Sequence, residues 1–134
     1  MDIKLIQLQS HDDERGSLVS LEEQKNIPFP IKRIYYMFDT KDKIRRGFHA
    51  HKKLKQLAII LKGSCRFLLD DGKEKIEVLL DNPAQGLYIE SFVWREMFDF
   101  SDDSVLIVLA DAVYDEGDYV RDYEEFTNMV NNDS

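Results

Sequence analysis

The sequence is poor in cysteine, proline and glycine, and each shortage excludes a class of protein. Cys65 is the only cysteine among 134 residues, so no internal disulfide can form, and a reducing compartment, the cytoplasm, is the simplest expectation. Three prolines and six glycines are too few for a flexible linker or a low-complexity segment. With the chain length, these counts predict one folded domain over residues 1–134.

Long apolar runs and an excess of positive charge are also lacking. The longest apolar stretches, such as residues 57–61, fall far short of the roughly 20 residues that cross a membrane, and the N-terminus has no signal-type apolar block. The 18 Lys and Arg against 26 Asp and Glu give a net charge of −8 and a pI near 4.8. Nucleic acid and membranes are therefore not expected as partners, although a small anion could still bind a locally basic pocket.

What is present predicts an all-β protein. Hydrophobic residues make up 43% and charged residues 33%, a balance that supports a packed core. Short runs rich in β-branched and large apolar residues alternate with turn signals such as Asp71-Gly72, as in sandwiches and barrels. The central strands are expected to pair antiparallel with their sequence neighbours. The predicted strands are residues 3–8, 18–21, 31–38, 47–51, 56–61, 64–70, 75–80, 86–89, 94–100 and 105–110.

One segment near the C-terminus breaks the strand pattern. Between Asp118 and Val130, large apolar residues recur at spacings of three and four, which predicts one short amphipathic helix. Asp115 or Asp118 is expected to cap its start. The acidic residues of this region are expected on the solvated side of the helix.

A pair of histidines carries the strongest chemical signal. His49 and His51 lie two residues apart in a predicted strand, so both side chains project from one face. Such a pair suits a metal or proton transfer, and the alternative is a solvated strand edge. The basic residues around it predict a local anion site in an otherwise acidic chain. They are Arg45, Arg46, Lys52, Lys53 and Lys55.

The spacing around this pair resembles the first motif of the cupins, small jelly-roll β-barrels. His49-Ala50-His51 is followed after four residues by Gln56, where the motif has an acid, and after six more by Gly63. Met97 stands where the second cupin motif has a third histidine. Because two of four ligand positions are changed, we expect neither a stable metal site nor a cofactor. Neutral histidines are instead suited to acid–base chemistry near neutral pH.

A closer resemblance, in order along nearly the whole chain, is to the sugar 3,4-ketoisomerases, which are cupin enzymes acting on dTDP-4-keto-6-deoxy-D-glucose. It implies an all-β cupin jelly-roll β-barrel with a short C-terminal helix. It also implies that the ketone moves from C4 to C3 through an enediol, and that the product passes to a PLP-dependent aminotransferase making a 3-amino-3,6-dideoxyhexose. The blocks that carry the resemblance are residues 46–52, 63–65, 69–72, 86–88, 93–97 and 114–116.

The resemblance also implies roles for individual residues. His49 is expected as the principal acid/base and His51 as its partner in proton transfer or oxygen stabilisation. Tyr35 is expected to line the pocket as a further catalytic residue, the alternative being a core aromatic. An arginine at an inward strand position is costly unless it is paired, so Arg33 is expected to bind the dTDP diphosphate. Arg46 either shares that anion or is solvated.

Two further arginines, Arg15 and Arg95, are expected to face the sugar. They do not decide whether the product has galacto or gluco configuration at C4. An edge strand is expected to pair two copies as a homodimer.

Three other functions stay open at this point. A dTDP-4-keto-6-deoxyglucose epimerase would use a histidine without moving the ketone. A non-catalytic nucleotide-sugar binding module would need no histidine pair. A metal-dependent cupin oxygenase would need the ligands that Gln56 and Met97 replace.

Overall fold

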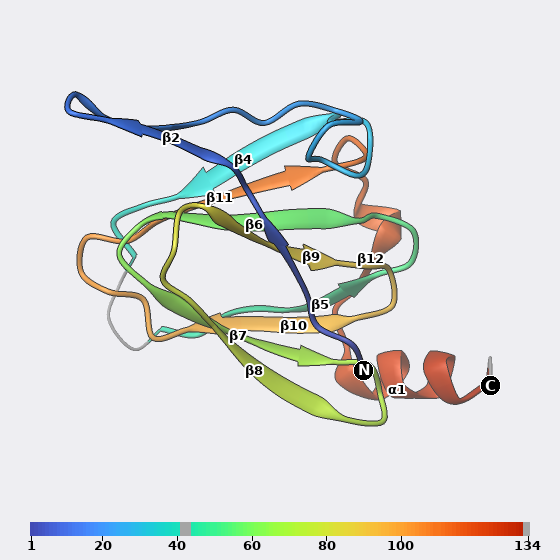
Figure 1. Cartoon of the computed structure of the whole chain (residues 1–134). Helices are drawn as coiled ribbons and strands as arrows, with labels where there is room; N and C mark the ends of the chain where they lie inside the picture. The colour runs from blue at the N-terminus through green and yellow to red at the C-terminus, as the bar shows by residue number, and fades with distance from the viewer. Residues whose placement is uncertain (41–43, 133–134) are drawn as a thin grey trace.

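The computed structural model describes residues 1–40 and 44–132, and strands make up most of its regular structure (Figure 1). A single-turn 3-10 helix over Glu116–Asp118 precedes the last strand. One α-helix, α1 (Tyr123–Asn132), closes the chain. The strands are β1 (Lys4–Gln7), β2 (Ser10–Asp13), β3 (Gly16–Val19), β4 (Arg33–Met37), β5 (Arg46–His51), β6 (Gln56–Lys62), β7 (Cys65–Asp70), β8 (Lys75–Leu80), β9 (Gln85–Ile89), β10 (Trp94–Phe98), β11 (Val105–Ala110) and β12 (Tyr119–Val120).

Two five-stranded sheets form the body of the molecule, with orders β1-β9-β6-β11-β4 and β12-β5-β10-β7-β8. The named strand pairs are all antiparallel. This confirms the all-β jelly roll with a short C-terminal helix, although the two sheets do not close into one continuous barrel. The expected pairing of sequence neighbours is wrong for the centre of the fold, because β6 pairs with β9 and β11 while β7 lies in the other sheet.

The space between the sheets is apolar over most of its length. Its main cluster includes Phe67, Leu69, Leu87, Leu106 and Val108, each at most 3% exposed. Burying such side chains contributes roughly 1.5–3 kcal/mol each and holds the sheets together. A smaller cluster of Ala50, Trp94, Val120 and Phe126 seats α1 on the outer face of the second sheet. The inward residues at the β5, β6 and β4 end are polar, and they form the site described below.

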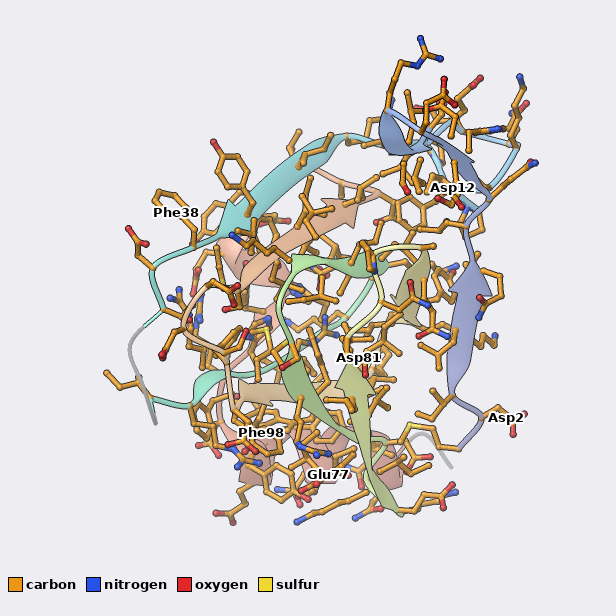
Figure 2. All side chains as sticks on the ribbon, turned by 60° about the vertical axis from the view of Figure 1, so that its left-hand side comes forward. Asp2, Asp12, Phe38, Glu77, Asp81 and Phe98 are labelled. Carbon is orange, nitrogen blue, oxygen red and sulfur yellow. The ribbon has the colours of Figure 1, made fainter. Side chains whose placement is uncertain are left out.

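The β2–β3 hairpin projects from this body, and Asp12 marks it in Figure 2. The sequence pattern did not predict β2, because Ser10, His11, Asp12 and Asp13 are all polar. His11 is exposed there, as expected for a surface residue.

The helix begins at Tyr123, five residues later than predicted. Tyr119 and Val120 form β12 instead, paired with His51 and Ala50. Asp122, and neither Asp115 nor Asp118, lies before the helix and accepts from the backbone N–H of Glu124 at 2.9 Å. Pairing with β5 outweighs the weak local preference for helix in this segment.

Candidate active site

A β-bulge in β5 sets the direction of the two histidines. Arg95 of β10 lies opposite His49, and Glu96 lies opposite Gly47, so Phe48 is an extra residue without a partner. Gly47 and Phe48 both have positive φ, at +95° and +57°. Positive φ strains a bulky residue such as phenylalanine, and strain of this kind is concentrated at functional sites. The bulge leaves Phe48 exposed and its neighbour His49 buried.

The hydrogen bonds of the two imidazoles fix their neutral tautomers. His49 Nδ1 lies 3.1 Å from the carbonyl oxygen of Gly47, which can only accept, so Nδ1 carries the proton. His51 Nδ1 lies 3.2 Å from Oδ2 of Asp118, and the same reasoning applies while Asp118 is ionised. Nε2 of each ring is therefore left with its lone pair, ready to accept a proton.

Asp118 holds His51 from a fixed position. Its Oδ1 accepts from the backbone N–H of Lys53 at 2.9 Å, and its Oδ2 accepts from that of Leu54 at 3.2 Å. Only 12% of its side chain is exposed. The expectation that Asp118 lies on a solvated helix face is wrong, because the segment folds back against β5. The carboxylate instead orients a candidate catalytic ring.

Arg95 is a buried cation beside this pair. It is 2% exposed, and it donates from Nη1 to Oε1 of Gln56 and from Nη2 to the Val93 carbonyl at 2.9 Å. Burial lowers its pKa to about 10, so it remains charged at neutral pH. Burial, and then the charge of Arg95, lower the pKa of His49 to about 4 and that of His51 to about 2. Both histidines are consequently neutral at physiological pH, so Nε2 of each ring is unprotonated.

The opposite sheet contributes Arg33 and Tyr35 from the inward face of β4. The Tyr35 hydroxyl accepts from Nε2 of Gln56 at 3.0 Å, and burial raises the pKa of the phenol. The Arg33 guanidinium carbon lies 4.8 Å from the Tyr35 ring centroid and 5.2 Å from that of Tyr114. The expected inward positions of Arg33 and Tyr35 are thus observed.

Tyr119 is a member of the site that the sequence did not predict. Its ring centroid lies 5.0 Å from that of His49 and 4.4 Å from that of His51. Arg121 stacks on the same ring at 4.2 Å. The only sequence signal was helical spacing, which assigned Tyr119 to the buried side of the helix.

A hollow of about 190 Å³ opens beside these groups. In the described part of the chain, three buried side-chain atoms lack a hydrogen-bond partner, and all three belong to this cluster: Arg33 Nη1, His51 Nε2 and Arg95 Nε. Leaving a buried polar atom unpaired costs roughly 1–3 kcal/mol, so three in one place mark a site where water or a polar ligand binds. The residues that line the hollow include Arg33, His51, Asp111, Asp118 and Tyr119.

Two predicted arginines lie apart from this cluster. Arg46 is exposed at the start of β5. Arg15 follows β2, in the turn of the projecting hairpin, with its side chain 84% exposed and its guanidinium 2.6 Å from Asp13. One chain by itself therefore brings together His49, His51, Tyr35, Arg33 and Arg95, and leaves Arg15 and Arg46 outside.

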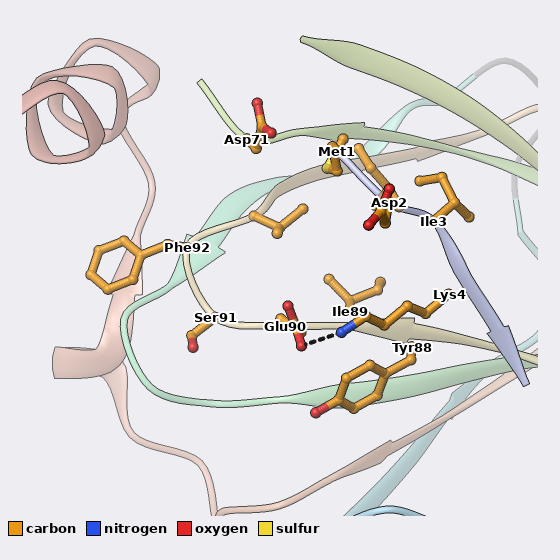
Figure 3. Close-up of a pocket in the computed structure, with 12 residues that line it drawn as sticks. Met1, Asp2, Ile3, Lys4, Asp71, Tyr88, Ile89, Glu90, Ser91 and Phe92 are labelled. Atoms are coloured by element: carbon orange, nitrogen blue, oxygen red, sulfur yellow. Dashed lines mark hydrogen bonds and ion pairs between the residues drawn. The ribbon is translucent and has the colours of Figure 1, made fainter. Parts of the chain in front are cut away.

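A larger hollow of about 340 Å³ lies elsewhere, between the N-terminal residues and the connection from β9 to β10 (Figure 3). An ion pair of 2.7 Å between Lys4 and Glu90 crosses it. None of the predicted site residues lines it, and no histidine is among its lining residues.

Among residues 1–40 and 44–132, no group of three or more His, Cys, Asp or Glu is placed to hold one metal ion. Gln56 and Met97, which stand at cupin ligand positions, are engaged elsewhere: Gln56 with Arg95 and Tyr35, and Met97 in the apolar core. In the same residues, no helix is long and apolar enough to span a membrane.

Comparison with known proteins shows the family to which the chain belongs. The chain is 55% identical over 130 residues, covering 97% of itself and 94% of its relative, to the TDP-4-oxo-6-deoxy-alpha-D-glucose-3,4-oxoisomerase of Aneurinibacillus thermoaerophilus. It is 49% identical, with a TM-score of 0.94 and 98% of both chains covered, to a crystal structure of a 3,4-ketoisomerase from Helicobacter canadensis.

A third relative is a mutant 3,4-ketoisomerase from Thermoanaerobacterium thermosaccharolyticum in complex with TDP-4-keto-6-deoxyglucose. It is 42% identical with a TM-score of 0.95, and the match covers 97% of this chain and 94% of that one. The model of the family described as FdtA: WxcM-like, C-terminal matches residues 1–131. The chain therefore belongs to the FdtA family, whose solved and curated relatives include sugar 3,4-ketoisomerases.

Proposed function

We propose that this protein is a 3,4-ketoisomerase that moves the ketone of dTDP-4-keto-6-deoxy-D-glucose from C4 to C3. The observation that carries the proposal is a pair of buried neutral imidazoles, each with a free Nε2, beside the buried cation of Arg95. Ketone migration requires a proton acceptor near C3 and positive charge near the oxygen of the intermediate, and this arrangement provides both. The family relationship supports the same reaction.

In the proposed reaction, Nε2 of His49 removes the proton from C3, and the C4 carbonyl oxygen takes up a proton as the enediol forms. The C3 hydroxyl then releases its proton as the new carbonyl forms, and C4 receives a proton. His51 acts as the partner in these transfers, and Arg95 stabilises the negative charge that develops on oxygen. Arg33, with an unpaired Nη1, binds the diphosphate. Tyr35 faces the sugar.

The test is proton NMR of the EDTA-treated protein with dTDP-4-keto-6-deoxy-D-glucose in D2O, with His49→Asn as the inactive control. New 3-keto signals with deuterium at C4 are expected, and the couplings at C4 identify the galacto or gluco product. Exchange at C3 and C5 with the ketone still at C4 would indicate the epimerase. Binding without exchange would indicate a binding module.

We further propose a homodimer formed through β4. This edge strand exposes Ile34 and Tyr36, and Phe38 follows directly after it, each between 55% and 62% exposed. Phe38 points away from the body of the molecule in Figure 2. An edge strand with such an apolar face favours pairing with a second copy.

The chemistry of the product indicates the next step. A ketone at C3 is the substrate form that a PLP-dependent aminotransferase requires, so we propose such an enzyme as the consumer of the product. Cytoplasmic localisation, expected from the single cysteine, stays a prediction.

A further inference from the structure

Gln56 connects the buried cation of the site with its buried phenol. It is the first residue of β6 and is 3% exposed. Its side-chain oxygen accepts from Nη1 of Arg95, and its side-chain nitrogen lies 3.0 Å from the Tyr35 hydroxyl. The sequence places Gln56 where a metal-binding cupin has an acid, but the structure shows it engaged at both ends by side chains.

The direction of each hydrogen bond in this chain is determined by its members. A guanidinium can only donate, so the amide oxygen of Gln56 must face Arg95. The amide NH2 then faces Tyr35, and the phenol oxygen must accept. Because that oxygen already accepts from Gln56, the single proton of the Tyr35 hydroxyl remains free for a third group.

We propose that Gln56 is a positioning residue that presents Tyr35 as a hydrogen-bond donor to the C4 carbonyl oxygen of the keto sugar. The inference rests on the proposed function and adds to it the origin of the proton-donating group. Tyr35 lies on the same inward face of β4 as Arg33, opposite the sheet that carries the histidines. Acid and base thus approach the sugar from different sheets. Burial raises the pKa of Tyr35, which keeps the donor protonated.

A glutamate of the same shape could not replace Gln56. A carboxylate only accepts, so the Tyr35 hydroxyl would donate to it and would no longer be free for the substrate. The carboxylate would also neutralise Arg95. The Gln56→Glu variant should nevertheless fold, since it gives Arg95 an ion partner in place of a neutral one.

The experiment measures kcat and KM for ketone migration in wild type, Gln56→Glu, Tyr35→Phe and the double variant. Gln56→Glu should lower kcat by about 100-fold or more and change KM by less than about threefold, because a transition-state hydrogen bond is lost. Gln7→Glu, the same change at an exposed position of β1, is the matched control and should behave as wild type. Thermal unfolding and dTDP binding confirm that each variant is folded.

The double variant separates positioning from a general structural role. If Gln56 acts through Tyr35, Gln56→Glu should cause a clearly smaller fold-loss in the Tyr35→Phe background than in wild type. An equal fold-loss of kcat in both backgrounds, or a fully active Gln56→Glu, would overturn the positioning role of Gln56 and leave the proposed function standing. A wild-type protein that leaves the ketone at C4 would instead overturn the proposed function itself.

Discussion

At the scale of single residues, the carboxylate behind His51 decides which imidazole nitrogen accepts a proton. Asp118→Asn keeps the shape of the side chain but can place an amide N–H against Nδ1 of His51. The ring proton then moves to Nε2, which can no longer accept a proton. We expect kcat to fall by about 100-fold or more, with dTDP affinity nearly unchanged. Steady-state kinetics and calorimetry measure the two effects.

Asp122→Asn is the matched control for that change. Asp122 accepts from the Glu124 backbone at the start of α1, so its loss should cost at most about 1 kcal/mol of stability and leave kcat intact. Full activity of Asp118→Asn would show that the tautomer of His51 does not matter.

The unpaired guanidinium nitrogen of Arg33 leads to a prediction about binding. Arg33→Ala should weaken dTDP affinity by about 10- to 100-fold, because a charge-assisted contact to the diphosphate is lost. Arg46→Ala, at the exposed start of β5, should change affinity by less than about twofold. Titration calorimetry with dTDP compares the affinities of the two variants. A larger loss of affinity in Arg46→Ala than in Arg33→Ala would place the diphosphate near the start of β5.

The lowered histidine pKa values make stability depend on pH. In the folded protein the pKa of His49 is about 4 instead of 6.5, so between these values the unfolded chain binds more protons. Stability must then fall as pH drops from 6.5 toward 4. His49→Asn removes this contribution. Between pH 7.5 and 5.0 its free energy of unfolding should therefore fall by about 2 kcal/mol less than that of wild type.

Urea unfolding at the two pH values measures this difference. His11→Asn, on the exposed hairpin, is the control and should follow wild type. If His49→Asn follows wild type as well, burial of the ring does not affect its protonation.

At the scale of elements, the bulge in β5 is the feature that aims the histidines. A Cβ at Gly47 would lie 2.8 Å from the Arg95 carbonyl oxygen, in a backbone conformation with φ +95°. Gly47→Ala should therefore cost about 1–3 kcal/mol and lower kcat by moving His49.

Gly16→Ala provides the comparison. Its φ is also positive, at +135°, but a Cβ there meets nothing within 4 Å. Urea unfolding and kinetics on both variants distinguish the cost of a positive φ from the cost of a Cβ that lies too close to its neighbours. An active Gly47→Ala with wild-type stability would show that the bulge can relax without moving the site.

At the scale of the whole molecule, the exposed apolar face of β4 predicts where two copies meet. Tyr36→Lys places a charge on this face and should shift the protein from dimer to monomer in sedimentation or light scattering. Leu79→Lys, at the exposed edge strand β8 of the other sheet, should leave the dimer intact. Dissociation by Leu79→Lys alone would place the interface on the opposite sheet.

The strand pattern predicted most of the fold because side chains alternate along a strand. Residues 75–80 and 105–110 were predicted with their observed bounds, and the same alternation predicted that His49 shares a face with His51 and Arg33 with Tyr35. Pairing was less predictable. Whether β6 joins β7 or β9 is decided by how two sheets bury their inner faces together, which local turn signals do not contain.

The sequence by itself determined the chemistry available: two histidines on one strand face, an arginine and a tyrosine on another, and Gln56 and Met97 at two cupin ligand positions. Tertiary structure decided how these groups are used. Asp118 meets His51 from 67 residues away, and Gln56 meets Arg95 from 39 residues away. The first contact exists because β12 pairs with β5, and the second exists because β6 and β10 face each other from opposite sheets. Local patterns predict which way a side chain points, but a partner this distant is set only when the sheets pack.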